Sequence, residues 1–129
     1  RFYIAMKMSD RRAETMENAI VAALSAFPPQ LVKTITCDRG TEFANWRRIE
    51  ERLHCEVYFA DPYCAWQKGT NENLNGLLRE FYPKGRNLSR VAPATLKRNL
   101  ALLNARPRKV LYFHSAQELW DFELNSCCT

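Results

Sequence analysis

Residues 31–43 read LVKTITCDRGTEF and are the most informative stretch of this chain. Residues 31–37 are short, apolar and β-branched, a pattern that is typical of a buried strand. Asp38 follows this strand directly, and Arg39-Gly40 predicts a turn. We therefore expect the Asp38 side chain at the carboxyl edge of a sheet, where α/β folds place their ligand sites. The position also fits a purely structural role, because Asp before a Gly turn is common turn chemistry.

The flanking residues predict alternating strands and helices. Residues 42–53 are expected to form a helix, and residues 55–60, which read CEVYFA, a second strand. Upstream, we expect a short strand at 2–8 and then a helix that Ser9-Asp10 caps and Pro28-Pro29 ends. Further helices are expected at 71–81, 93–104 and 115–124, before a frayed tail at 125–129. This alternation predicts an α/β layer architecture.

The helix predicted at 71–81 carries a second notable carboxylate, Glu72, which lies 34 positions after Asp38. Helical spacing places Leu74, Leu77, Leu78 and Phe81 on an inward face and Glu72, Asn75, Gly76 and Arg79 on the opposite face. Two carboxylates that a fold brings together suit a hard divalent cation such as Mg²⁺. A purely structural role for Glu72 is the alternative, because Glu in a first helical turn commonly complements the helix dipole.

Positive charge is concentrated in one part of the chain. The 129 residues have a formal net charge of +5, but residues 79–109 contain nine Lys or Arg and a single acid, Glu80. A basic block of this size is typical of a polyanion partner, because Lys and Arg that neutralise phosphates release condensed counterions. A basic face that only keeps the protein soluble is the alternative.

Other features exclude several functional classes. No apolar run approaches the length of a membrane span, and residues 1–8 do not resemble a signal peptide. The five Cys form no C-x-x-C pair, which favours reduced thiols, and with only two His the chain does not favour a structural zinc site.

Four ordered segments carry a family resemblance that covers essentially residues 1–120. Residues 36–44 read TCDRGTEFA and residues 57–73 read VYFADPYCAWQKGTNEN; residues 77–85 and 103–111 read LLREFYPKG and LNARPRKVL. Together they closely resemble the catalytic core of bacterial insertion-sequence transposases of the IS-thirty family, within the retroviral-integrase-like DDE superfamily. The resemblance implies a ribonuclease-H-like α/β fold, a mixed sheet flanked by helices, here lacking its first strands. It also implies a partial integrase-like core at 1–112 and a carboxy-terminal helix and tail at 113–129.

By the same resemblance, Asp38 matches the second acid of the catalytic triad and Glu72 the third. Both are thus expected to be catalytic metal ligands for Mg²⁺ or Mn²⁺, in hydrolysis of a phosphodiester at the element's ends and transfer of the freed strand to target DNA. The first acid has no match, so we expect that it precedes residue 1 and that the fragment alone is inactive. Arg39 stands where the family often has Asn and places a cation beside Asp38.

The remaining expectations concern DNA and metal surroundings. Asn71, Asn73 and Asn75 are candidates for hydrogen bonds to metal-bound water or phosphate, or for helix capping. Tyr63 and Trp66 are candidates for stacking on an unpaired base, or for packing onto the core. The residues expected to contact the DNA backbone are Lys68, Arg79, Lys84, Arg106, Arg108 and Lys109.

We further expect DNA as the partner, a homo-oligomer in the intact protein, and a location in the bacterial cytoplasm at the nucleoid. Two alternatives are a DNA-binding remnant of a decayed transposase that does not cut DNA, and a ribonuclease-H-like nuclease that acts on RNA in a hybrid. The strings around Asp38 and Glu72 argue against the second.

Overall fold

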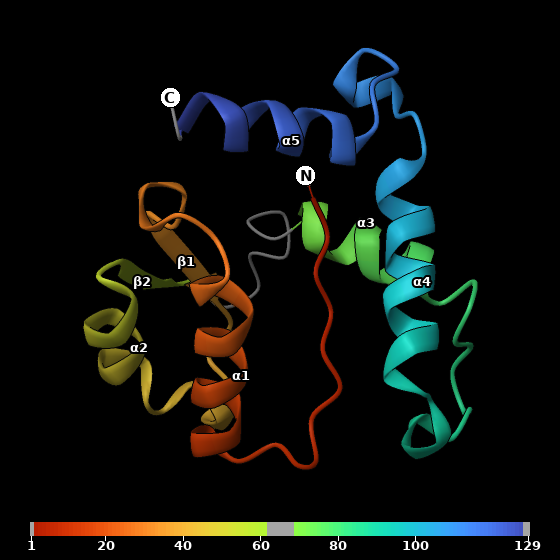
Figure 1. Ribbon diagram of the computed structural model, residues 1–129. Coiled ribbons are helices and arrows are strands. Elements are labelled where there is room, and N and C mark those ends of the chain that lie inside the picture. The colour runs from red at the N-terminus through yellow and green to blue at the C-terminus, as the bar shows by residue number, and fades with distance from the viewer. Residues whose placement is uncertain (1, 62–68, 128–129) are drawn as a thin grey trace. The chain divides into compact units, whose positions relative to one another are not determined.

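A computed structural model describes residues 2–61 and 69–127 of the chain (Figure 1). The chain divides into two compact units, one formed by Met6–Lys68 and the other by Arg1–Ala5 together with Gly69–Cys127. None of the helices in the described part of the chain has the length and apolar character that a membrane span requires.

The unit of residues 6–68 is built around two parallel strands, β1 (Thr34–Cys37) and β2 (Glu56–Phe59). Thr34 pairs with Glu56 and Cys37 with Phe59, so the two strands run in step. The crossover helix α2 (Trp46–Leu53) joins them, as parallel strands require, and α1 (Ala13–Ser25) packs against α2 (Figure 1). The predicted α/β character is thereby confirmed at the level of a small parallel sheet with helices.

One apolar core fixes this unit. Ile49, Leu53 and Val57 are buried together with the thiols of Cys37 and Cys55. Ile49 and Leu53 come from one side of α2, and the ring of Trp46 meets that of Phe59 edge-on at 6.0 Å. Partly buried side chains complete the core: Ile20, Val21, Leu24, Val32, Ile35, Phe43, Trp46 and Phe59. In both helices, apolar residues at helical spacing form these packed faces.

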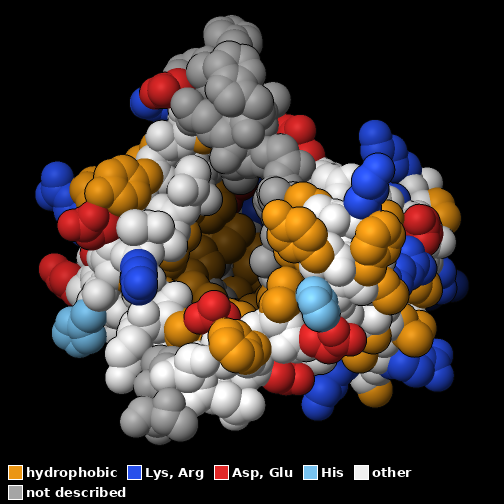
Figure 2. Space-filling view, turned by 90° about the horizontal axis from the view of Figure 1, so that it is seen from above, with side chains coloured by type: hydrophobic (Ala, Val, Ile, Leu, Met, Phe, Trp, Pro, Cys, Tyr) orange, Lys and Arg blue, Asp and Glu red, His pale blue; other side chains and the backbone are white. Residues whose placement is uncertain are grey.

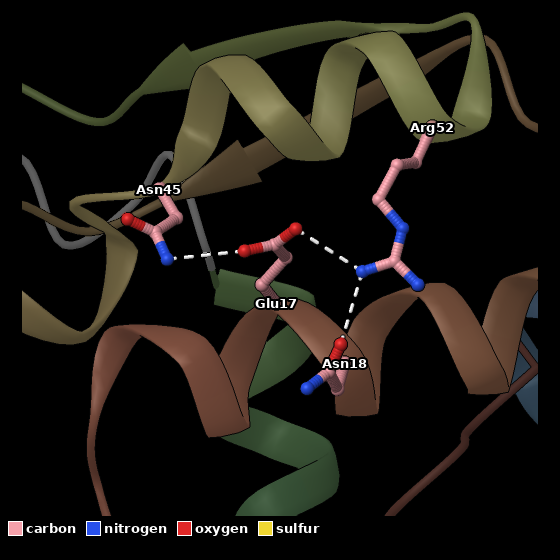
Figure 3. Close-up of polar contacts among 4 residues, drawn as sticks. All are labelled: Glu17, Asn18, Asn45 and Arg52. Carbon is pink, nitrogen blue, oxygen red and sulfur yellow. Dashed lines mark hydrogen bonds and ion pairs between the residues drawn. The ribbon is translucent and has the colours of Figure 1, made fainter.

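A buried carboxylate also joins α1 to α2 (Figure 3). The Glu17 side chain is 7% exposed and accepts hydrogen bonds from Asn45 Nδ2 at 3.0 Å and Arg52 Nη1 at 3.1 Å. The same Arg52 nitrogen donates to Asn18 Oδ1 at 3.0 Å. Because a buried charge is tolerated only when it is paired and hydrogen-bonded, this network orients the two helices.

The unit of residues 1–5 and 69–127 is helical. Its core consists of Tyr3, Leu74 and Leu103, against which Leu77, Leu78, Phe81 and Leu100 pack. Phe2 stacks on Trp120 with the ring centroids 5.3 Å apart. The helices are α3 (Gly69–Leu78), α4 (Pro93–Ala105) and α5 (Ala116–Cys127), with short 3₁₀ turns η4 (Leu88–Arg90) and η5 (Lys109–Leu111). Pro93 stands in the first turn of α4, as predicted, where its missing N–H costs nothing.

Three sequence predictions are wrong in detail. Residues 2–8 form no strand, because no described strand runs beside them and the side-chain amide of Asn104 takes up the backbone groups of Tyr3 instead. Asp10 does not cap α1, whose N-cap is Arg12; its carboxylate accepts the Arg12 N–H at 2.9 Å before the helix starts. Residues 125–127 belong to α5 and are not a frayed tail. The domain boundary expected between 112 and 113 stays a prediction.

Candidate active site

Asp38 lies where the sequence predicts it, directly after β1 at the carboxyl end of the strand pair. Its side chain is exposed, and Oδ1 accepts a hydrogen bond from the Gly40 N–H at 3.0 Å. The carboxylate therefore shapes the turn at residues 38–40 and stands at the carboxyl edge of the strand pair, as predicted, while its role as a metal ligand stays a prediction.

The neighbouring strand brings a second carboxylate to the same edge. The Ala60 N–H donates to the Cys37 carbonyl at 2.8 Å, which extends the pairing of the strands and leaves Asp61 exposed just beyond it. Asp61 is not among the residues that the sequence predicts for the site. A usable signal was present, because Asp61 follows its strand as Asp38 follows β1, and parallel strands end at one edge.

Arg39 turns toward β2. Its Nη2 lies 4.0 Å from Asp61 Oδ1 and its Nε donates to the Ala60 carbonyl at 3.4 Å. Both partners of this ion pair are largely exposed, so it contributes little to stability. Arg39 therefore has a carboxylate partner, Asp61, at the same end of the strand pair as Asp38.

Glu72 lies in the first turn of α3 and is exposed. Leu74 is buried and Leu77 and Leu78 pack on the core, so the helix face that carries Glu72 is directed to solvent, as predicted. Arg79 follows the end of α3 and is exposed as well. Asn71 and Asn73 are exposed beside it. Asn75 Oδ1 accepts a hydrogen bond from the Tyr3 hydroxyl at 2.6 Å, and burial of this hydroxyl raises its pKa.

The two acids belong to different units, Asp38 to Met6–Lys68 and Glu72 to Gly69–Cys127. Their meeting around one ion therefore stays a prediction. Among the described residues, no group of three or more His, Cys, Asp or Glu could hold a metal ion. Each acid by itself offers an exposed hard oxygen donor, the kind of ligand that Mg²⁺ prefers.

Some of the cations expected to contact DNA already make contacts within the fold. Arg106 Nη1 lies 3.2 Å from Glu80 Oε2 and its guanidinium lies 5.9 Å from the Phe81 ring centroid. Arg108 is half-buried, and Nη2 donates to the Leu103 carbonyl at 3.2 Å near the end of α4. These side chains brace the helices, a role that the sequence analysis did not predict.

The other expected cations are more open to a ligand. Arg79, Lys84 and Lys109 are exposed. Lys68 lies outside the described residues, as do Tyr63 and Trp66. The surface in the right-hand part of Figure 2 shows Lys and Arg side chains interspersed with hydrophobic ones.

No family model matches the chain. Curated proteins do. The chain is 36% identical to a probable transposase for the insertion-like sequence element IS1161 from Streptococcus salivarius. This match extends over 121 residues, which are 94% of this chain and 34% of the relative. It is 39% identical over 119 residues, 92% of this chain and 36% of the relative, to the transposase for insertion sequence element IS4351 from Bacteroides fragilis. It is 35% identical over 119 residues, 92% of this chain and 31% of the relative, to transposase InsI for insertion sequence element IS30C from Escherichia coli K12. The chain thus spans about a third of the length of these curated relatives.

Proposed function

Because this chain is by homology a segment of an IS30-type insertion-sequence transposase, we propose that it contributes two acids, Asp38 and Glu72, to a metal-dependent DNA-cutting and DNA-joining site. The observation that carries the proposal is the place of Asp38. It stands exposed at the carboxyl end of a parallel β1-α2-β2 unit, inside a segment that is homologous to transposases over nearly its whole length. The parallel pair is compatible with the proposed ribonuclease-H-like architecture.

The chemistry follows from hard oxygen donors and phosphate. Asp38 and Glu72 would hold Mg²⁺ or Mn²⁺, which would lower the pKa of the attacking water or hydroxyl and neutralise charge on the leaving oxygen. In the first step, a water oxygen bonds to phosphorus and the 3′-oxygen leaves as a free hydroxyl. In the second, that 3′-hydroxyl attacks a phosphodiester of target DNA and displaces another 3′-oxygen. The carboxylates position these groups and form no covalent bond to DNA.

Surrounding side chains are proposed to hold the DNA. Arg79, the exposed residue directly after the end of α3, is proposed to contact a nearby phosphate, and Asn71 and Asn73 flank Glu72 on the helix. Lys84, Arg106, Arg108, Lys109 and Lys68 complete the proposed backbone contacts. Since one reaction cycle handles both ends of an element, we also propose a homo-oligomer for the intact protein.

An alternative is a remnant that binds DNA without cutting it. It is favoured by one observation: Arg39 places a cation next to Asp38 in the chain, at the edge where a metal ion would have to bind. On this alternative we expect binding to DNA and no Mg²⁺-dependent nicking.

A chimera tests the proposal. The homologous segment of the IS30C transposase is replaced by this chain, and cleavage and transfer of marked element ends are measured with and without Mg²⁺. We expect activity that Asp38→Asn or Glu72→Gln each reduces to background. Asp121→Asn, which changes an exposed acid on α5, is the matched control and should leave activity intact. A chimera that folds and binds the ends but never cuts would support the remnant; one that still cuts with Glu72→Gln would overturn the assignment.

A further inference from the structure

The loop between α4 and α5 is a closed, braced structure. In residues 107–115, which we call the 107–115 loop, Pro107 forms a β-bridge with Ser115. The Arg108 N–H donates to the His114 carbonyl at 3.1 Å, and the Phe113 N–H donates to the Arg108 carbonyl at 2.8 Å. The Arg108 side chain ties the loop to the Leu103 carbonyl. A loop with so many internal hydrogen bonds presents its tip in one conformation.

That tip carries two aromatic side chains into solvent. Tyr112 is 89% exposed and Phe113 72% exposed. Both have a left-handed backbone, with φ of 53° for Tyr112 and 65° for Phe113, a conformation that non-glycine residues rarely adopt. Strained residues persist only where the surrounding structure imposes them, and they gather at binding sites. A fold that needed only a turn here would be better served by glycine.

The charge near the tip indicates which kind of partner would bind there. Lys109 is exposed within the loop, and the chain leading up to it, residues 79–109, holds nine Lys or Arg and one acid. The acids beyond the loop are partly engaged: Glu118 Oε2 lies 3.2 Å from His114 Nδ1, and Asp121 Oδ1 accepts from Gln117. Flat aromatic rings next to cations suit a partner that has both π-faces and phosphates, namely a nucleic acid with an unpaired base.

We propose that Tyr112 and Phe113 stack on an unpaired DNA base while Lys109 contacts an adjacent phosphate. This inference rests on the proposed function, because a strand end that is freed by cutting separates from its complement more readily and leaves bases unpaired, and it adds a contact outside the acids. Stacking is sequence-tolerant, since every base has a π-face. The site should therefore recognise the unpaired state and not a particular base.

The test measures the affinity of the 129-residue chain for a duplex and for the same duplex with a short single-stranded overhang, by fluorescence anisotropy. We expect the overhang to bind more tightly, by about tenfold. Tyr112→Gly should abolish this preference while leaving the duplex affinity and the salt dependence unchanged. Because glycine accepts the left-handed backbone at no steric cost, this variant should unfold at the same or a higher urea concentration, so a lost preference could not be ascribed to misfolding.

Two controls sharpen the result. Phe122→Ala removes another exposed aromatic ring, on α5 and outside the loop, and should keep the preference. Lys109→Ala should weaken binding to both DNAs and reduce the salt slope by about one.

An unchanged preference in Tyr112→Gly would overturn the inference, as would an equal loss for both DNAs. The inference would likewise fail if Tyr112→Gly changed only self-association in sedimentation, because the tip would then be a protein contact. None of these outcomes bears on the acids, whose role is decided separately by Asp38→Asn and Glu72→Gln in the chimera.

Discussion

The side-chain amide of Asn104 pairs with both backbone polar groups of Tyr3, 101 positions away in the chain. Asn104 Oδ1 accepts the Tyr3 N–H and Asn104 Nδ2 donates to the Tyr3 carbonyl, each at 2.8 Å. Asn104 is 2% exposed, so its side-chain amide supplies the two hydrogen bonds that a neighbouring strand would otherwise give to the buried Tyr3 backbone. This pairing fastens the start of the chain to α4.

We therefore predict that Asn104→Asp lowers the free energy of unfolding by about 2–3 kcal/mol, because it leaves the Tyr3 carbonyl facing a buried carboxylate in place of a donor. Urea denaturation at neutral pH measures the change. Asn73→Asp, at an exposed position of α3, is the control and should shift stability by no more than about 0.5 kcal/mol. Equal shifts for the two variants would show that the Tyr3 pairing contributes nothing.

The Glu17 network gives a second prediction. Arg52→Ala removes the cation from the Glu17 carboxylate, which is only 7% exposed, so we expect the free energy of unfolding to fall by about 1–3 kcal/mol. The decrease should be smaller than for a fully buried ion pair, because Arg52 itself is 43% exposed. Arg39→Ala removes an arginine of the same unit whose ion pair with Asp61 is open to water, and should cost about 0–1 kcal/mol. Thermal and urea unfolding of both variants provide the comparison. The prediction fails if Arg39→Ala is the more destabilising.

Asp10 should report on the turn that precedes α1. Hydrogen bonds from the Thr15 side chain and then from the Arg12 backbone lower the pKa of its carboxyl group in the folded chain. A lowered pKa means that the associated stability is present above the unfolded-state value of about 4 and is lost as the pH falls through the folded-state value. Thr15→Val should move the pKa of Asp10 back up, which a carboxyl NMR titration detects. An identical titration curve in the variant would rule out the Thr15 contact.

Two glycines should respond to alanine in opposite directions. Gly76 lies inside α3 with nothing within 4 Å of an added Cβ, so Gly76→Ala should stabilise by about 0.5–1 kcal/mol. Gly85 has equally open space but a φ of +89°, so Gly85→Ala should destabilise by about 1 kcal/mol or more through backbone strain. Unfolding midpoints of the two variants test this, and a destabilised Gly76→Ala would contradict it.

Much of the local structure could be predicted from the sequence, because it depends on neighbours along the chain. The apolar spacing predicts α1, α2, α3 and α4 within a few residues, and the β-branched runs predict β1 and β2. Asp38 could be placed at a strand end for the same reason. The prediction failed at residues 2–8, since a strand exists only when another strand pairs with it.

Part of the site depends on contacts between distant residues. How far each cation is already engaged depends on nearby acceptors: Arg106 pairs with Glu80 and Arg108 donates to the Leu103 carbonyl, while Lys109 is exposed. A count of Lys and Arg ranks these residues equally. Asp61 could likewise join Asp38 at one edge only once the parallel register of β1 and β2 was known.

By itself, the sequence determined the order of the helices and strands after residue 8, the basic block, and the motifs that carry the family resemblance. These features depend on residue type and spacing along the chain, and they do not require contacts between distant residues. Only the tertiary structure decided that Asn104 anchors Tyr3, that Glu17 is buried between two helices, and that Tyr112 and Phe113 face solvent on a left-handed backbone. The physical reason is that burial, hydrogen-bond partners and positive φ are imposed by groups far away in the chain, which local pattern does not record.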